Sequence, residues 1–368
     1  MLYRKGLEME CLMKPGRQKR FLSQATLMRL MKVCVIGDRR VVVEDKPVPV
    51  PGRGDVLVAM RACGICGTDI EKIAGNYSST VLGHEAVGEV VSVGSEVEGV
   101  SVGERVFPHH HVPCYDCHYC RTGSETMCPH FSSSNIHPGG LSEFFVMPEW
   151  NIIHGGLFKL PGPMTYRTGT LIEPLACVLR GLDKLKLNSE STVTIVGAGP
   201  VGMLHIYALQ SLGVKNIVAM DISKERCDFA LAFGASSAGV PGDAMNMSIM
   251  SLTDGRGADA SIIATGHPLA TESGISCLRR GGSALQFGLP HPNTTLIHDI
   301  SDIFRKEIQL LSTYSGVESD VAKAISMLDK KKGKADEMIS HSFRLEDTPA
   351  AFYLAEKTGN AMKIIIEN

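Results

Sequence analysis

Four cysteines lie close together in one short stretch of the chain. Their spacing is C-x2-C-x2-C-x7-C, and the residues are Cys114, Cys117, Cys120 and Cys128. Four thiolates that short turns bring together form a closed tetrahedral site, which suits a structural zinc ion. An iron–sulfur cluster is the competing interpretation. We expect His118, which lies between the cysteines, to be exposed and not a ligand.

A second group of potential metal ligands is spread over three segments. It offers one thiolate, one imidazole and two carboxylates, from Cys66, His84, Glu85 and Glu173. Each residue alone has an ordinary explanation, such as a small apolar filler or a solvated turn. Together they form the mixed set typical of an open catalytic zinc site, which leaves a position for water or substrate. We therefore expect a catalytic zinc in addition to the structural one.

A glycine-rich turn, Gly197-Ala198-Gly199-Pro200-Val201-Gly202, has the spacing GxGxxG. An apolar run over 192–196 precedes it, and a stretch of helical character over 203–212 follows. The first glycine permits a tight turn, the second lets the backbone approach a pyrophosphate, and the third allows close packing of helix on strand. The order of strand, turn and helix predicts a dinucleotide-binding motif and not an ordinary glycine-rich turn.

An acidic residue stands at the end of the next apolar run. That run covers 216–220 and ends at Asp221. A carboxylate there can accept hydrogen bonds from both hydroxyls of an adenosine ribose, and it repels a 2′-phosphate. The pattern therefore favours NAD over NADP. Lys224 and Arg226 follow closely enough to soften this preference, and Arg226 is a candidate for contact with the cofactor.

Length, charge and hydropathy limit the remaining possibilities. The 368 residues are enough for two domains with separate cores. A formal net charge of −2 gives no bulk attraction to nucleic acid or to an anionic membrane. No apolar run reaches the roughly 20 residues that span a bilayer. Without a secretory hydrophobic region, we interpret the 11 cysteines as metal ligands and core residues, not as a disulfide framework. We expect a cytoplasmic protein without a nucleic-acid or membrane partner.

The first 30 residues differ from the rest. They are basic, rich in methionine and without strand alternation. We interpret them as a disordered extension, or as an upstream start before Met31, and a targeting segment is the alternative.

The rhythm of the apolar runs changes along the chain. Short runs separated by Gly and Pro predict an antiparallel, partly open barrel from strands at 33–36, 41–44, 55–62, 86–93, 105–108 and 141–146. From about residue 176, strands alternate with helices, which predicts a doubly wound parallel sheet. The later elements are strands at 260–264, 283–287, 308–312 and 361–367 and helices at 320–330 and 348–357. We expect an α/β protein in which a cofactor domain (177–312) interrupts a domain built from 31–176 and 313–368, with the metal lobe at about 108–130.

These motifs together resemble those of the zinc-dependent medium-chain alcohol and polyol dehydrogenases. The zinc signature of that family matches Gly83-His84-Glu85-x2-Gly88-x5-Gly94. The likeness extends through the Cys66 motif, the four cysteines and the GxGxxG turn to 343–347 and 350–352. It covers nearly all of residues 31–368. The resemblance implies a GroES-like catalytic domain interrupted by a Rossmann domain, in agreement with the change of rhythm.

The resemblance also implies roles for residues around the metal. It assigns Cys66, His84 and either Glu85 or Glu173 as ligands of the catalytic zinc. Alcohol dehydrogenase uses two cysteines and one histidine. Glu173 stands where its second cysteine falls, which is similar to the polyol and sugar branch.

Two residues shortly after Cys66 match further positions of the family. Thr68 matches the Ser/Thr position that relays the substrate proton to the ribose hydroxyls. A cap at the start of a helix is an equally natural explanation for Thr68, and the two roles are compatible. Glu71 stands where alcohol, sorbitol and threonine dehydrogenases commonly carry His, and it resembles some sugar dehydrogenases.

Further segments complete the expected site. Phe287-Gly288-Leu289 matches the segment whose backbone meets the nicotinamide amide, and Thr265 with Gly266 flanks the cofactor. The three consecutive histidines at 109–111 are expected to line the edge of a cleft, with one of them in contact with substrate. A second metal tract is the alternative for these histidines.

We therefore predict an NAD-dependent dehydrogenase with two zinc ions per chain, acting on a secondary or sugar hydroxyl of a polyol or sugar. L-threonine 3-dehydrogenase and a general alcohol dehydrogenase are the alternatives, and Glu71 counts against the former. A zinc-stabilised nucleotide-binding protein without catalysis is a remote alternative, because such derivatives typically lose the ligands that are present here. The resemblance implies a homotetramer or homodimer, with the strand at 308–312 as a candidate pairing edge.

Overall fold

The computed structural model of the chain describes residues 29–75, 77, 80–296, 298–331, 333–357 and 361–368. The basic stretch at 1–30 thus lies almost wholly outside the described residues, and Leu30 already belongs to the first strand. Among the described residues, no helix is long and apolar enough to cross a membrane.

Strands from both ends of the chain form one mostly antiparallel sheet. Its strands are β3 (Val56–Gly64), β4 (Glu85–Val93), β5 (Arg105–Pro108), β6 (Phe144–Met147), β7 (Leu157–Lys159), β14 (Ile339–Arg344) and β15 (Lys363–Glu367). Their order is β14-β15-β3-β4-β5-β7, and β6 also pairs with β3. A two-stranded ribbon joins β1 (Leu30–Gly37) and β2 (Arg40–Pro47). The expected antiparallel sheet is confirmed except at β14 and β15, which pair in parallel.

The strand expected at 141–146 is shifted toward the C-terminus. Leu141 lies before β6, where its backbone N–H donates to Leu82 O at 2.9 Å and its carbonyl accepts from Cys34 N at 2.8 Å. The backbone of Leu141 therefore serves the segments around β1 and β4, and regular pairing with β3 begins only at Phe144.

The middle of the chain forms a six-stranded parallel sheet. Its strands are β8 (Thr192–Val196), β9 (Asn216–Met220), β10 (Ser237–Gly239), β11 (Ala258–Ile263), β12 (Leu278–Gln286) and β13 (Gln309–Ser312). The order is β10-β9-β8-β11-β12-β13, so the direction of winding reverses between β8 and β11. In such folds, ligands bind at the carboxyl ends of the strands at this reversal. The expected doubly wound sheet is confirmed.

The helices connect and cover these sheets. Their bounds are α1 (Gly67–Ala74), α2 (His118–Arg121), α3 (Pro129–Ser133), α4 (Glu149–Ile153), α5 (Tyr166–Gly169), α6 (Ile172–Asp183), α7 (Pro200–Ser211), α8 (Lys224–Phe233), α9 (Asp243–Leu252), α10 (Pro268–Ser276), α11 (Ile300–Lys306), α12 (Glu318–Lys330) and α13 (Thr348–Lys357). Short 3₁₀ turns cover Glu125–Met127, Ala335–Met338 and Leu345–Asp347.

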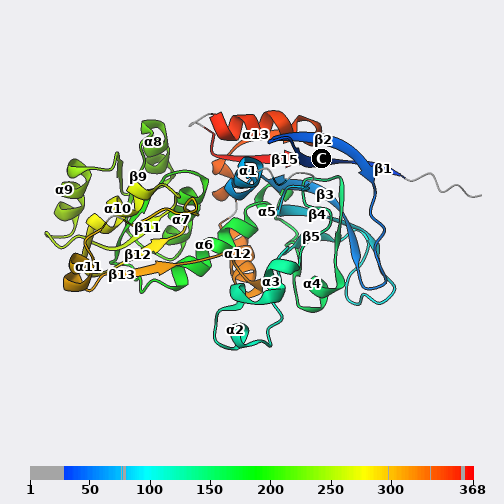
Figure 1. Ribbon diagram of the computed structural model, residues 1–368, viewed down its shortest axis with the longest axis horizontal. Coiled ribbons are helices and arrows are strands. Elements are labelled where there is room, and N and C mark those ends of the chain that lie inside the picture. Colours follow the sequence, from blue (N-terminus) through cyan, green and yellow to red (C-terminus); the bar gives the residue numbers. More distant parts are fainter. Residues whose placement is uncertain (1–28, 76, 78–79, 297, 332, 358–360) are drawn as a thin grey trace, which may run out of the picture.

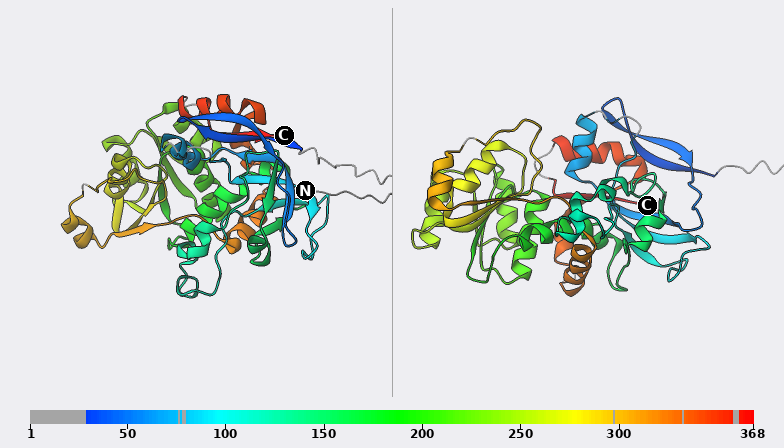
Figure 2. Two further views of the ribbon diagram at one scale, coloured as in Figure 1. Left: turned by 45° about the vertical axis from the view of Figure 1, so that its right-hand side comes forward. Right: turned by 60° about the horizontal axis from the view of Figure 1, so that its bottom comes forward.

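Helices α6 and α12 lie between the two sheets and join them. Figure 1 shows the parallel sheet on one side, the antiparallel sheet on the other, and α6 with α12 in between. One buried apolar cluster runs across this junction, from Val87 in the antiparallel sheet through Leu175 of α6 to Ile195 in the parallel sheet. The loop that carries α2 projects from the body below α12, as the left view in Figure 2 also shows. The two sheets are therefore held together by a continuous core.

Candidate active site and metal centres

Three potential zinc ligands meet where β3 ends and β4 begins. Cys66 is the N-cap of α1, while His84 and Glu85 stand at the start of β4. Gly64 at the end of β3 pairs with Glu85 at the start of β4. The segment after β3, which carries Cys66, therefore lies beside the segment before β4, which carries His84. One ligand atom from each of the three residues lies within 4.8 Å of the others. The set offers sulfur, nitrogen and oxygen donors, which fits a catalytic zinc site with an open position.

Asp69 orients the imidazole of His84. Its fully buried carboxylate lies 3.5 Å from His84 Nδ1 and accepts hydrogen bonds from the backbone N–H groups of Cys66 (3.3 Å) and Gly83 (3.4 Å). Burial raises the pKa of Asp69, but the charge of His84 and these hydrogen bonds outweigh it, so its pKa lies below the ordinary value. Burial lowers the pKa of His84, but Asp69 raises it well above the ordinary value. A carboxylate behind a ligand histidine fixes its tautomer and direction.

Lys363 holds the carboxylate of Glu85 from the opposite side. The two side chains form a buried ion pair, and Lys363 Nζ also donates to the carbonyl of Ile65 at 3.1 Å. Gly64 provides the room, because a Cβ there would stand 1.8 Å from Glu85 Oε2. Burial raises the pKa of Glu85, and the charge of Lys363 only partly offsets this. With Oε2 engaged by Lys363, Glu85 retains its other oxygen for a metal.

Sequence reasoning missed both Asp69 and Lys363 as site residues. Asp69 stands three residues after Cys66, a position where an acid is typical of a helix cap. Its carboxylate does accept a hydrogen bond from the backbone N–H of Cys66. Lys363 belongs to the buried strand β15, and a charged residue inside an apolar run was the available signal.

Glu173 lies beside the three ligands but outside their 4.8 Å group. It is buried in the first turn of α6, and its negative charge contributes to the raised pKa of Glu85. Cys177, one turn later, donates to Glu173 Oε1 at 3.3 Å. The structure therefore places both candidate carboxylates at the site, with Glu85 closer to Cys66 and His84.

Thr68 and Glu71 both lie on α1. Thr68 is exposed in the first turn of this helix, and the helix is capped by Cys66 and Asp69. The alternative explanation of Thr68 as a cap is therefore wrong, because the residue lies inside the helix. Glu71 is half-buried, and burial raises its pKa although the charge of His291, in the segment after β12, lowers it.

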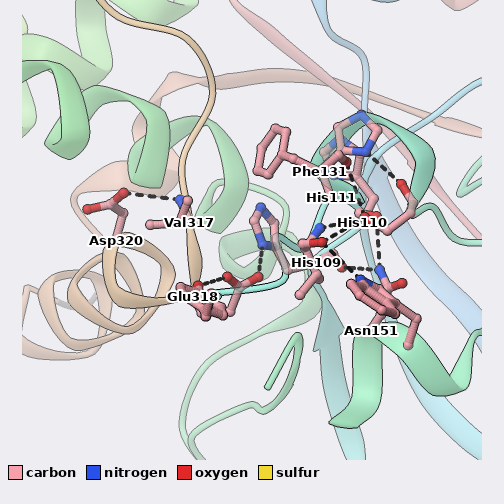
Figure 3. A network of polar contacts seen from close by, with 12 residues as sticks. His109, His110, His111, Phe131, Asn151, Val317, Glu318 and Asp320 are labelled. Carbon is pink, nitrogen blue, oxygen red and sulfur yellow. Dashed lines mark hydrogen bonds and ion pairs between the residues drawn. The ribbon is translucent and has the colours of Figure 1, made fainter. Parts of the chain in front are cut away.

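The three histidines after β5 are more buried than residues at the edge of a cleft. His109 and His110 are buried and His111 is half-buried. Figure 3 shows the network that holds them. Of these three histidines, His110 has a ring contact with the candidate ligand His84. The two ring centroids lie 5.0 Å apart. Burial, followed by the charges of His111, His84 and His109, lowers the pKa of His110 well below its ordinary value.

The four cysteines of the projecting loop come together as expected. The Sγ atom of Cys114 lies 3.5 Å from that of Cys128 and 4.0 Å from that of Cys120, and Cys117 and Cys120 are 3.6 Å apart. A tetrahedral site with zinc–sulfur bonds of 2.3 Å has sulfur–sulfur edges of about 3.8 Å. Hydrogen bonds from the backbone of Asp116 and Cys117 lower the pKa of Cys114 to about 6. His118 is exposed. The loop therefore fits a structural zinc ion.

The glycine-rich turn connects β8 to α7 at the point where the winding of the parallel sheet reverses. Gly202 is required for close packing, since a Cβ there would stand 2.1 Å from the carbonyl oxygen of Gly197. Pro200, which has no backbone N–H, and Val201 are the first two residues of α7, and the free N–H groups that follow Pro200 in its first turn can bind a pyrophosphate.

The Asp221 carboxylate faces the glycine-rich turn from the end of β9. Its Oδ2 accepts from Ala198 N at 2.7 Å, and its Oδ1 accepts from Ser223 N at 2.9 Å. Arg226 Nη1 lies 3.8 Å from Asp221 Oδ2, and a Cβ on Gly199 would stand 3.7 Å from the same nitrogen. The Asp221 carboxylate and the Arg226 guanidinium thus both lie next to the glycine-rich turn, where an adenosine ribose would bind.

The expected nicotinamide segments follow the neighbouring strands β11 and β12. Gln286 Nε2 donates to the carbonyl of Thr265 at 3.3 Å and to that of Gly288 at 2.6 Å, which ties the two loops together. Phe287 is half-buried and Leu289 is exposed. A Cβ on Gly181 of α6 would stand 3.4 Å from the ring of Phe287. The helix that carries Glu173 at its start therefore packs against the cofactor segment.

Comparison with known proteins agrees with this geometry. Residues 52–159 match the alcohol dehydrogenase GroES-like domain, and residues 200–330 match the zinc-binding dehydrogenase family. D-xylulose reductase A of Aspergillus niger is 30% identical over 359 residues, covering 94% of this chain and 98% of that protein. Sorbitol dehydrogenase of Halalkalibacterium halodurans is 30% identical over 331 residues, covering 88% and 94%.

A solved structure supports the same assignment. The crystal structure of 2R,3R-butanediol dehydrogenase from Bacillus subtilis superposes with a TM-score of 0.80 at 25% identity, covering 92% of this chain and 99% of that one. The two family models match different parts of the chain, and both relatives match nearly its full length. The chain therefore belongs to the zinc-dependent medium-chain polyol dehydrogenases, which are oxidoreductases of CH–OH groups that use a nicotinamide cofactor.

Proposed function

We propose that the chain oxidises a secondary or sugar hydroxyl of a polyol or sugar and transfers the hydride to NAD. The observation that carries this proposal is the set of Cys66, His84 and Glu85, whose ligand atoms lie within 4.8 Å of one another. Glu173 lies beside this set on a helix that also packs against the segment at Phe287. This arrangement would hold a metal next to the helix that packs against the expected nicotinamide segment, as a transfer of hydride to NAD requires.

Cys66, His84 and one carboxylate, Glu85 or Glu173, would hold the catalytic zinc. When bound, such an ion supplies Lewis acidity that makes the alkoxide of the substrate accessible near neutral pH. Asp69 keeps the imidazole of His84 directed at the metal position. We infer that Thr68, exposed on α1 two residues after Cys66, accepts the proton of the substrate hydroxyl and passes it on.

We infer that NAD is preferred over NADP. Two backbone N–H groups hold the Asp221 carboxylate toward the glycine-rich turn, where it would accept from the ribose hydroxyls. Its negative charge would repel a 2′-phosphate. Arg226, 3.8 Å away, weakens this repulsion without removing the acid.

A polar substrate is supported by the side chains around the candidate zinc position. Glu85 and Glu173 bring two carboxyl groups, and His110 adds an imidazole next to His84. We infer that Glu71 on α1 extends this polar lining. Such a lining suits a substrate with several hydroxyls better than a simple aliphatic alcohol. The relatives named D-xylulose reductase and sorbitol dehydrogenase are in keeping with this choice.

We further propose two zinc ions per chain, the second one held by Cys114, Cys117, Cys120 and Cys128. We divide the chain into a catalytic unit of 31–176 and 313–368 and a cofactor unit of 177–312. The division is supported by the membership of the strands in the two large sheets. A homodimer or homotetramer is in keeping with the position of β13 at the end of the parallel sheet.

A substrate panel tests the proposed reaction. The panel contains xylitol, sorbitol, an aldose, L-threonine and hexan-1-ol, each with NAD and then with NADP, and formation of the reduced cofactor is measured. We expect the highest kcat/KM for a polyol or aldose with NAD. Higher kcat/KM with hexan-1-ol would contradict the polyol assignment, and higher kcat/KM with L-threonine would establish a threonine dehydrogenase.

A further inference from the structure

Each of the three histidines after β5 is held in a different way. His109 Nδ1 lies 2.6 Å from Oε1 of Glu318 at the start of α12, and His111 Nδ1 lies 2.7 Å from the carbonyl oxygen of Ser134. Figure 3 shows the contact between His109 and Glu318. The two outer imidazoles are therefore committed to protein partners, and they fix the ends of the histidine segment.

The backbone of the segment is held equally firmly. Buried Asn151 on α4 donates from Nδ2 to the carbonyl of His109 at 3.1 Å and to that of His110 at 2.9 Å (Figure 3). The N–H of His109 donates to the carbonyl of Gly156 at 2.7 Å. The backbone that carries the His110 side chain is thus held in place by the protein.

The side chain of His110 is the exception in this network. It is only 6% exposed, and its Nδ1 has no hydrogen-bond partner among the residues that the structure describes. Buried polar atoms of proteins are nearly always hydrogen-bonded, because an unpaired one loses its water without compensation. The ring centroid lies 5.0 Å from that of His84. An unpaired polar atom therefore stands next to a residue of the candidate metal site.

We propose that His110 is a substrate-recognition residue, whose imidazole hydrogen-bonds a hydroxyl on the carbon next to the one being oxidised. The two carbons of a 1,2-diol are joined by one carbon–carbon bond, so a second hydroxyl would lie close to the first, and the His110 ring packs beside the candidate ligand His84. The partner class is therefore a 1,2-diol, as found in polyols and sugars. This inference rests on the proposed function and adds the recognition of a second hydroxyl to it.

A matched pair of substrates isolates this hydrogen bond. Butane-2,3-diol and butan-2-ol share the carbon chain and the oxidised secondary alcohol, and they differ in one hydroxyl. The ratio of their kcat/KM values with NAD is measured for the wild-type chain and for His110→Phe, which keeps an aromatic ring without nitrogen. We expect the diol-to-alcohol ratio to fall by about tenfold, because a buried hydrogen bond to the diol is lost. His154→Phe, at a ring stacked on Trp150 in α4, is the matched control and should leave the ratio as it is.

A second variant keeps the proposal testable if His110→Phe folds poorly. In His110→Asn the side-chain amide places a polar atom near the position of Nδ1, and it should restore at least a third of the wild-type ratio. Calorimetric binding of the diol to the NADH complex should follow the same order of wild type, Asn and Phe. Zinc content and unfolding temperature confirm that each variant retains the site.

Two results would overturn the proposal. One is an equal loss of kcat/KM on both substrates in His110→Phe, which would make His110 a packing residue. The other is a wild-type ratio near one, because the chain would then not recognise the second hydroxyl at all. Failure of the proposed function itself looks different, since the wild-type chain would then reduce NAD with neither substrate.

Discussion

The buried carboxylate of Asp69 lies 3.5 Å from Nδ1 of His84, so that the imidazole has Nε2 left for a metal. A histidine ligand without such a partner can rotate and change its tautomer, and the loss of the partner typically costs 10- to 100-fold in metal affinity. The contact also joins the start of α1 to the start of β4, the two segments that carry Cys66 and Glu85. The geometry of the candidate site therefore depends on this pair.

The first prediction concerns zinc affinity. Asp69→Asn keeps the shape of the side chain but removes its charge, and we expect zinc at the Cys66 site to bind about 10- to 100-fold more weakly. The measurement is competition with a chromophoric chelator. Asp45→Asn, an exposed acid on β2, is the control and should bind zinc like the wild-type chain. Unchanged zinc affinity in Asp69→Asn would show that the acid does not orient the ligand.

The second prediction concerns the projecting loop. Cys120 and Cys128 pack with Phe131 and with Val317 before α12, so a metal there would also hold the start of that helix. We expect Cys120→Ser to retain about one zinc ion per chain where the wild type has two, and to unfold several degrees lower. Metal analysis and calorimetry check this. A Cys120→Ser chain with two zinc ions would refute the four-cysteine site.

The third prediction concerns the choice of cofactor. Asp221→Ser removes the charge that repels a 2′-phosphate and leaves Arg226 in place to attract it. We expect the ratio of kcat/KM with NADP to that with NAD to rise at least about tenfold. Asp228→Ser, an exposed acid on α8, should keep the wild-type ratio. If Asp221→Ser also kept that ratio, the acid would not be the discriminating group.

The fourth prediction concerns the dependence of stability on pH. His205 of α7 is fully buried against Phe287, and burial lowers its pKa to about 4. Because the pKa in the folded state lies below that of the unfolded chain, the stabilisation is complete above about pH 6.5 and is lost as pH falls toward 4. Between pH 7.5 and 5.5, His205 should cost the wild type about 1 kcal/mol of unfolding free energy.

Urea unfolding of the wild type and of His205→Leu at both pH values measures this difference. The leucine variant lacks the titrating group, so its loss of stability over this interval should be smaller by about that amount. An equal loss in both chains would mean that His205 is not kept neutral by the fold.

Periodicity and turn chemistry were enough to predict most of the fold. The strand at 105–108 and the helix at 348–357 have the bounds that the apolar pattern indicates. The strand at 141–146 is displaced because Leu141 pairs with Leu82 and Cys34, which are distant in sequence. Local patterns cannot report such a competition between partners.

The candidate site was predictable only in part. Cys66 and His84 stand in recognisable motifs, and their proximity follows from the pairing of β3 with β4. Lys363 lies 278 positions after Glu85 in the sequence. The pairing of β15 with β3 brings its side chain into contact with the Glu85 carboxylate. The placement of Glu173 depends on how α6 packs between the two sheets, which no local motif encodes.

The most direct measurement is the oxidation of a polyol by the Cys66→Ala chain, made together with metal analysis. Reduction of NAD with xylitol is followed for the wild type and for this variant, which keeps the four-cysteine loop. We predict that Cys66→Ala retains about one zinc ion and an intact fold, while its kcat/KM falls at least about 1000-fold, because the Lewis acid at the substrate hydroxyl is lost. A Cys66→Ala chain that oxidises xylitol at the wild-type rate would contradict a catalytic metal at Cys66, His84 and Glu85.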